Sequence, residues 1–181
     1  MGRDKALLTY GGGTFLETIV RAVSLAGIEK VAVVLGHNAA GIQAAVDLAG
    51  VQVVVNADYR RGQTSSLQAG LRALLAQSKV EAVLLCLVDH PTVLPSTIRL
   101  LLERFHGTQV PLVVPTYQGR RGHPILIDHS LFPELLGLPP EAGANAVTRK
   151  YRQVAELVEV ADRGIVLDVD DPGAYAALDA G

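Results

Sequence analysis

The sequence predicts an α/β fold built on a parallel sheet. Short β-branched apolar runs alternate with amphipathic segments, and short connections join them, which is the pattern of right-handed βαβ units. One run, residues 82–88, is apolar at every position, as in strands covered on both faces. A chain of 181 residues is long enough for one sizeable domain and short for two, so we expect a single domain over 1–181.

The first clear element is a helix over residues 14–26, because apolar side chains recur there at helical spacing. Thr14 and Glu17 have the spacing of a capping box, and Gly27 supplies a stop signal. The elements predicted next are a strand over 30–35, a helix over 38–49, a strand over 51–55, a helix over 67–76, a strand over 82–88 and a helix over 95–105.

The second half of the chain is less regular, although turn residues still separate its apolar runs. The predicted elements are strands over 110–115 and 125–127, helices over 131–136 and 144–151, strands over 154–160 and 165–167, and a last helix over 172–178. These segments extend the α/β pattern to the end of the chain.

Composition and charge argue against several classes of protein. The formal net charge of -2 gives no general attraction to nucleic acid or to anionic membranes. No apolar stretch approaches the roughly 20 residues of a membrane helix, and no signal-peptide pattern is present, so we expect a cytoplasmic protein. The single cysteine, Cys86, lies within the apolar run and is expected to be an inert core residue.

Asp89 follows the apolar run at the point where the predicted strand leaves the sheet. Ligands of open α/β sheets bind outside the carboxyl ends of the strands, so Asp89 is placed to meet a ligand or a metal. Pro91 fixes the shape of the turn that follows. Asp is also a common turn residue, so a capping role stays open. A second acidic strand end lies at residues 168–171.

Residues 56–66 form a polar connection between a predicted strand and a predicted helix. Thr64, Ser65 and Ser66 lie at the helix N-terminus, where free backbone N–H groups favour an anion. The same residue types are common helix caps, so simple capping is the alternative.

A third polar segment is the turn over residues 116–124, where Arg120 and Arg121 stand between glycines. Arginine offers a rigid fork for phosphate or carboxylate, and glycine lets a ligand approach the backbone; an exposed hairpin tip is the alternative. His123 is a candidate ligand group, although structural histidines are more common.

The two acidic strand ends are expected to share one edge of the sheet. Converging carboxylates repel each other unless a cation lies between them, and hard oxygen ligands suit Mg²⁺, which also takes phosphate oxygens. Lys5 and the two arginines would supply positive charge around a polyphosphate. The predicted ligand is therefore a nucleoside triphosphate with Mg²⁺, and because no GxxxxGK[ST] occurs, a P-loop protein is unsupported.

These segments together resemble the MobA-like nucleotidyltransferases. The similar segments are Met1-Gly2-x-x-Lys5 (family LAAGxSxRMGxxK), Asn56 with Gly62 and Ser65-Ser66-Leu67 (N…G…SSL), Asp89-x-Pro91 (DxP), and Asp168-Val169-Asp170-Asp171-Pro172 (DxDTP). One further segment resembles a motif of the MocA branch, the molybdenum cofactor cytidylyltransferases: Gly119-Arg120-Arg121-Gly122-His123-Pro124.

The resemblance implies a Rossmann-like three-layer α/β/α fold of the nucleotide-diphospho-sugar transferase type, with a mostly parallel sheet. It implies transfer of CMP from CTP to the phosphate of molybdopterin with release of pyrophosphate, and a molybdoenzyme or a cofactor-insertion chaperone as a further partner. The implied roles are Mg²⁺ binding for Asp89 and Asp170, catalysis for Lys5 and Asp89, nucleotide binding for Lys5, Asn56, Gly62, Ser65 and Ser66, and acceptor binding for Arg120, Arg121 and His123.

The sequence also departs from the family. The first strand and the LAAGxSxR loop have no match, so we expect a fold without that strand and a reading frame that starts further upstream. Asn145 stands where the family has an arginine, and Arg149, one helical turn later, could replace it. The alternatives are a transferase of the same fold that uses GTP or another phosphate acceptor, and a non-catalytic module that binds molybdopterin or a protein partner.

Overall fold

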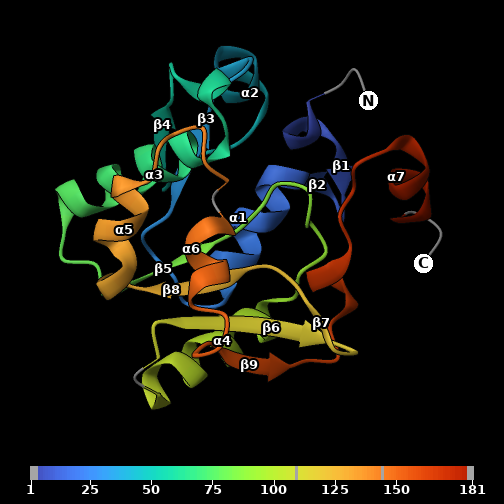
Figure 1. Ribbon diagram of the computed structural model, residues 1–181. Helices are drawn as coiled ribbons and strands as arrows, with labels where there is room; N and C mark the ends of the chain where they lie inside the picture. Colours follow the sequence, from blue (N-terminus) through green and yellow to red (C-terminus); the bar gives the residue numbers. More distant parts are fainter. Residues whose placement is uncertain (1–3, 109, 144, 179–181) are drawn as a thin grey trace.

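The structure is a computed structural model that describes residues 4–108, 110–143 and 145–178. It confirms the α/β class, because helices cover a central sheet (Figure 1). Among these residues, no helix is both long and apolar enough to cross a membrane. The predicted roles of Met1 and Gly2 and the helix start at Ala144 lie outside the described residues.

The chain begins with small elements that lead into the first helix. A 3₁₀-helix, η1 (Lys5–Leu7), precedes a hairpin of β1 (Thr9–Tyr10) and β2 (Gly13–Thr14), and α1 (Phe15–Leu25) follows. The predicted capping box is confirmed: Glu17 N donates to Thr14 Oγ1 at 3.2 Å, and Thr14 N donates to Glu17 Oε2 at 2.7 Å. Two of the free N–H groups at the start of α1 are thereby satisfied.

Two separate sheets follow. The first pairs β3 (Ala32–Leu35) with β4 (Gln52–Val55) in parallel, and α2 (Ala39–Ala45) connects them. The second has five strands: β5 (Ala82–Leu85), β8 (Ile125–Asp128), β6 (Leu112–Tyr117) and β7 (Arg120–Arg121) in spatial order, with β9 (Glu156–Glu159) beside β6. In the described part of the chain, no strand pairing joins the two sheets.

The second sheet is mixed, so the prediction of a mostly parallel sheet is wrong for it. Only β6 and β9 pair in parallel, whereas β5 with β8, β8 with β6, and β6 with β7 are antiparallel. The cause is the turn after β6, where Gln118 and Gly119 have φ of 50° and 75°. Two successive residues with positive φ reverse the chain tightly, so that the strand returns antiparallel.

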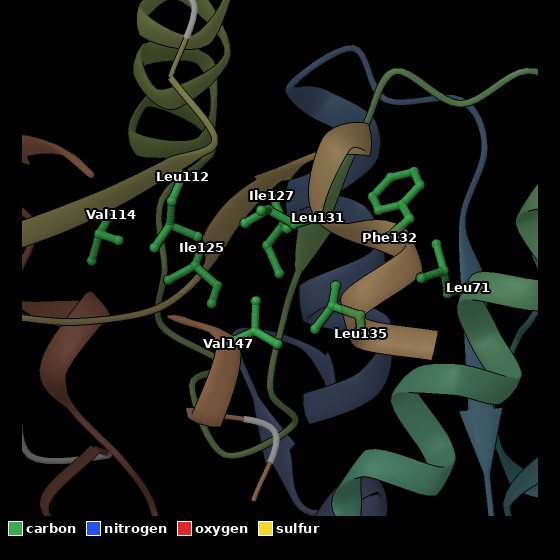
Figure 2. Close-up of a cluster of buried hydrophobic side chains, with 9 residues drawn as sticks. All are labelled: Leu71, Leu112, Val114, Ile125, Ile127, Leu131, Phe132, Leu135 and Val147. Carbon is green, nitrogen blue, oxygen red and sulfur yellow. The ribbon is translucent and has the colours of Figure 1, made fainter. Parts of the chain in front are cut away.

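Alternate residues of β6 and β8 build a core on each face of the sheet. Val113 and Leu126 pack on one face with Leu101 of α4 (Pro95–Gly107), below a 3₁₀-helix, η4 (Arg163–Val166). Figure 2 shows the opposite face, where helices α3 (Gln63–Gln77), α5 (Phe132–Gly137) and α6 (Asn145–Lys150) cover the sheet. The side chains drawn there are Leu71, Leu112, Val114, Ile125, Ile127, Leu131, Phe132, Leu135 and Val147. This arrangement gives three layers.

Helix α1 contacts both sheets. Its Leu16 belongs to a cluster with Val33 of β3, and its Ala22 and Val23 pack near Ile98 of α4. This helix therefore joins the β3–β4 pair to the rest of the molecule through side-chain packing.

One predicted strand is wrong: residues 165–167 do not form a strand, because η4 covers 163–166 and Leu167 is its C-cap. Asp162 causes the turn, since its carboxylate accepts a hydrogen bond from Gly164 N at 2.8 Å and another from Thr97 Oγ1 at 2.7 Å. This buried carboxylate caps the 3₁₀ turn, and a strand would leave it without those donors.

The remaining elements keep the predicted order with shifted ends. Helix α2 ends at Ala45 instead of 49, α3 begins at Gln63 instead of 67, and short 3₁₀-helices, η2 (Tyr59–Arg61) and η3 (His129–Leu131), precede α3 and α5. The last helix is α7 (Pro172–Leu178).

Candidate active site

The segment after β5 carries Asp89 to the carboxyl end of that strand, as predicted. Its backbone carbonyl accepts a hydrogen bond from Val169 N at 2.9 Å. The Val169 side chain is buried in a cluster with Leu8 and Phe15. These contacts bring the acidic segment 168–171 beside Asp89, so the two acidic segments meet at one place.

Lys5 joins the two carboxylates. Its ammonium nitrogen lies 3.4 Å from Asp89 Oδ2 and donates a hydrogen bond to Asp170 Oδ1. The side chains of Lys5 and Asp89 are 27% and 26% exposed, whereas that of Asp170 is 63% exposed. The cluster therefore lies in a shallow position that a solute can reach.

The charges in this cluster shift one another's pKa values. Burial by itself would lower the pKa of Lys5, but the hydrogen bond to Asp170 and the charges of Asp89 and Asp170 outweigh burial and raise it. The hydrogen bond from Lys5, followed by its positive charge, lowers the pKa of Asp170. Lys5 and Asp170 are therefore both charged at neutral pH.

Asp89 Oδ1 is buried and has no hydrogen-bond partner among the residues that the structure describes. His90 Nε2 lies 3.9 Å from this oxygen, beyond hydrogen-bonding distance. A buried carboxylate oxygen without a donor is costly unless a ligand satisfies it, and hard oxygen atoms are suitable ligands for a divalent cation. The donor set therefore fits a cation such as Mg²⁺ or Mn²⁺ that takes its other ligands from phosphate and water.

The predicted nucleotide-binding residues of the 56–66 segment are engaged with each other. Asn56 Nδ2 donates to Ser65 Oγ at 2.9 Å and to Ser66 Oγ at 3.0 Å, while Asn56 Oδ1 accepts from Asp58 N at 3.0 Å. Asn56 and Ser65 are buried. These two side chains hold the shape of the segment, and Gly62 and the partly buried Ser66 are the members nearer to solvent.

The start of α3 is fixed by the loop that follows α5. Gly62 has φ of 117°, and a Cβ there would lie 3.2 Å from the carbonyl oxygen of Pro140. Thr64 Oγ1 donates to the carbonyl of Ala142, and Arg61 pairs with Glu141 at 2.9 Å. The left-handed conformation and the close carbonyl together explain glycine at position 62.

The predicted acceptor-binding arginines lie on β7, and both are exposed. Glu159, at the end of β9, holds their hairpin: its carboxylate accepts hydrogen bonds from Thr116 Oγ1 and from Gln118 N, the latter at 2.8 Å. These bonds lower the pKa of Glu159, the Thr116 bond most, which keeps the carboxylate charged. Arg120 and Arg121 therefore extend from a rigid turn.

His123 lies next to His90, with ring centroids 5.4 Å apart. Burial, with a contribution from the positive charge of His90, lowers the pKa of His123, although Asp89 opposes this shift. The two rings line a small pocket with Ile19, Ala22, Cys86, Leu87, Val93, Ile98 and Pro124. His90 therefore links His123 to the Asp89 cluster.

The structure brings some predicted residues together and leaves others apart. Lys5, Asp89 and Asp170 form one cluster, and His123 is linked to it through His90. Asn56 and the two serines form a separate network. Asn145 begins α6, Arg149 lies in its last turn, and both are exposed.

Sequence reasoning missed two features of the site. Glu159 was not predicted to support the arginine hairpin, because it lies inside the strand predicted over 154–160, whereas the observed strand β9 ends at Glu159. The contact of Lys5 with both carboxylates was also missed, because no sequence spacing relates positions 5, 89 and 170.

The arrangement defines an α/β protein with a charged cluster of Lys5, Asp89 and Asp170 beyond the carboxyl end of β5. Residues 1–155 match the MobA-like NTP transferase domain, and the chain belongs to this nucleotidyltransferase family. Nicotine blue oxidoreductase from Paenarthrobacter nicotinovorans is 32% identical over 177 residues, which are 94% of this chain and 85% of that protein.

Two solved structures are similar to this chain over nearly its whole length. The crystal structure of Rv0371c from Mycobacterium tuberculosis has a TM-score of 0.85 and 30% identity, and the match covers 100% of this chain and 91% of that one. A manganese complex of the same mycobacterial protein has a TM-score of 0.82 and 30% identity, with 99% and 94% of the two chains covered.

Proposed function

We propose that this nucleotidyltransferase transfers CMP from CTP to the phosphate of a molybdopterin-type acceptor, with release of pyrophosphate. The observation that carries the proposal is the cluster of Lys5, Asp89 and Asp170 at the carboxyl end of β5. Catalysis of this kind consists of positioning and charge neutralisation, because the terminal phosphate oxygen of the acceptor attacks the α-phosphorus and pyrophosphate leaves.

Asp89 and Asp170 would hold the divalent cation, Mg²⁺ in our proposal, which neutralises phosphate charge when bound. The orphaned Oδ1 atom of Asp89 supports this assignment. Lys5 would stabilise charge on the triphosphate. The manganese complex of the mycobacterial relative is consistent with a divalent cation in this family.

The other assignments rest on the placement of three groups. Gly62 and Ser66, held in shape by Asn56 and Ser65, would contact the nucleotide. Arg120 and Arg121 would bind the acceptor phosphate from their rigid hairpin, because paired guanidinium groups suit phosphate oxygens. His123 would face the pterin from the pocket that it shares with His90.

A second candidate is a redox reaction, favoured by the similarity to nicotine blue oxidoreductase. The cluster of two carboxylates and one lysine does not by itself supply electrons, so such a reaction would need a separate reductant, for which a nicotinamide cofactor is the simplest class.

The test measures pyrophosphate release with Mg²⁺, a molybdopterin-type acceptor, and either CTP or GTP. We expect release with CTP that depends on the cation and on the acceptor. Asp89→Asn should lower it about 10²-fold to 10³-fold. Glu103→Gln, a change at an exposed carboxylate on α4, should leave it unchanged. Release with GTP alone would identify a guanylyltransferase. Oxidation of NADH or NADPH without pyrophosphate release would overturn the proposal in favour of an oxidoreductase.

A further inference from the structure

The ammonium group of Lys5 lies where a divalent cation shared by Asp89 and Asp170 would lie. It contacts one oxygen of each carboxylate. Converging carboxylates need a positive charge between them, and Lys5 supplies it in this structure. The site therefore already contains a cation that belongs to the chain.

A divalent cation and this ammonium cannot both occupy the space between the carboxylates. Two carboxylates and one ammonium carry a net charge of about −1, and an ammonium beside a divalent ion would repel it strongly in a partly desolvated site. The entry of the metal therefore requires Lys5 to leave. Asp89 Oδ1, which Lys5 does not contact, is the atom left for the incoming ion.

Lys5 can leave by side-chain rotation, because its backbone is held. Leu8 N donates to the carbonyl of Lys5 at 3.1 Å, and Leu7 N donates to the carbonyl of Asp4 at 3.0 Å. The lysine side chain itself is partly exposed and has four rotatable bonds. Its movement needs no rearrangement of η1.

We propose that Lys5 is a resident cation that a divalent metal must displace, and that the phosphates of the nucleotide hold Lys5 after its displacement. Metal binding and nucleotide binding are then coupled: each favours the arrangement that the other requires. The metal alone binds weakly, and it binds well when the nucleotide is present. This inference rests on the proposed function, because it takes a nucleotide triphosphate as the second ligand.

The experiment measures the binding of Mn²⁺ alone, by electron paramagnetic resonance and calorimetry, to the full chain. The variants are Lys5→Met and Lys5→Gln, which remove the charge, Lys5→Arg, which keeps it, and Lys79→Met, a matched loss of an exposed lysine. Lys79 precedes β5 and so lies near the amino end of that strand, whereas Asp89 lies beyond its carboxyl end.

We expect both neutral variants to bind Mn²⁺ about tenfold more tightly or better than the wild type, because a repelling unit charge is gone. Lys5→Arg and Lys79→Met should bind as the wild type does. Adding Asp89→Asn to Lys5→Met should remove the gain. Unchanged or weaker Mn²⁺ binding in both neutral variants would overturn the inference, as would an equal gain in Lys79→Met.

Binding of a non-hydrolysable CTP analogue separates this inference from the proposed function. If the wild type binds the analogue with Mn²⁺ but the neutral variants show no gain for Mn²⁺ alone, the displacement inference fails and the proposed function stands. If the neutral variants show the gain but no nucleotide analogue binds, Lys5 is the resident cation of a metal site and the nucleotide part of the inference fails.

Discussion

The region after β5 and the region after β4 have similar sequences in one respect: both place polar side chains where a strand leaves its sheet. After β5, Asp89 has one oxygen on Lys5 and one oxygen without a partner. After β4, Asn56 uses both its nitrogen and its oxygen within its own segment. The first region has a polar atom left for a ligand, whereas the Asn56 side chain of the second region is satisfied by its own segment. A strand-end position therefore indicates a site only where the polar group is left unsatisfied.

Asp89→Asn should have the largest effect if the first region is catalytic. We expect pyrophosphate release to fall about 10²-fold to 10³-fold, the range seen when a charge-stabilising group is removed from an active site. The unfolding free energy in urea should stay within about 1 kcal/mol of the wild type, because the Asp89 side chain is bonded to the partly exposed ammonium of Lys5. A large loss of unfolding free energy with retained pyrophosphate release would show that Asp89 is structural and not catalytic.

Asn56→Ala tests the second region and should act on stability. The change leaves the Ser65 and Ser66 hydroxyls without their donor and Asp58 N without its acceptor. Unsatisfied buried groups cost about 1–3 kcal/mol, measured by urea unfolding. Gln77→Ala, an exposed amide at the end of α3, is the control. Mn²⁺ binding should be unaffected, and its loss would show that the two regions form one site.

Gly62→Ala also tests the stability of the segment after β4, and we expect a smaller loss of unfolding free energy than for Asn56→Ala. The φ of 117° and the Pro140 carbonyl at 3.2 Å both disfavour a side chain, so we expect a loss of about 1 kcal/mol or more. Gly137→Ala is the control, because a Cβ at position 137 meets no atom within 4 Å. Equal unfolding midpoints for the two variants would contradict this reading of the segment.

The pH dependence of the first region should be the smallest effect, because Asp170 is exposed. Its pKa is lowered by Lys5, so the ion pair stabilises the fold above the unfolded-state pKa, ordinarily 3.8, and loses that contribution as the pH falls through the lower folded pKa. Lys5, whose pKa is raised, stays charged over this range. The difference in melting temperature between wild type and Asp170→Asn should therefore narrow from about pH 7 to about pH 3. A difference in melting temperature that does not change with pH would argue against the ion pair of Lys5 and Asp170.

The sequence predicted the order of most helices and strands, because hydrophobic periodicity and caps act over a few neighbouring residues. The Thr14 and Glu17 capping box is an example, since both residues and the bonds between them lie within one turn. The same local reasoning failed at 165–167, where the apolar run is folded into a 3₁₀ turn by Asp162 and its contact with Thr97, which is 65 positions away.

The candidate site was also predicted only in part from the sequence. The sequence alone was enough to single out Asp89 as a carboxylate beyond a strand end, and Asp170 through the DxDTP-like segment, although the strand predicted before Asp170 is a 3₁₀ turn. Only the tertiary structure decided that Lys5 lies between these carboxylates and that Asp89 Oδ1 has no partner in the described part of the chain. It also decided that the Asn56 side chain is hydrogen-bonded within its own segment. The physical reason is that satisfaction of a polar group depends on atoms brought together from distant parts of the chain, and these distances are set by packing of the whole fold.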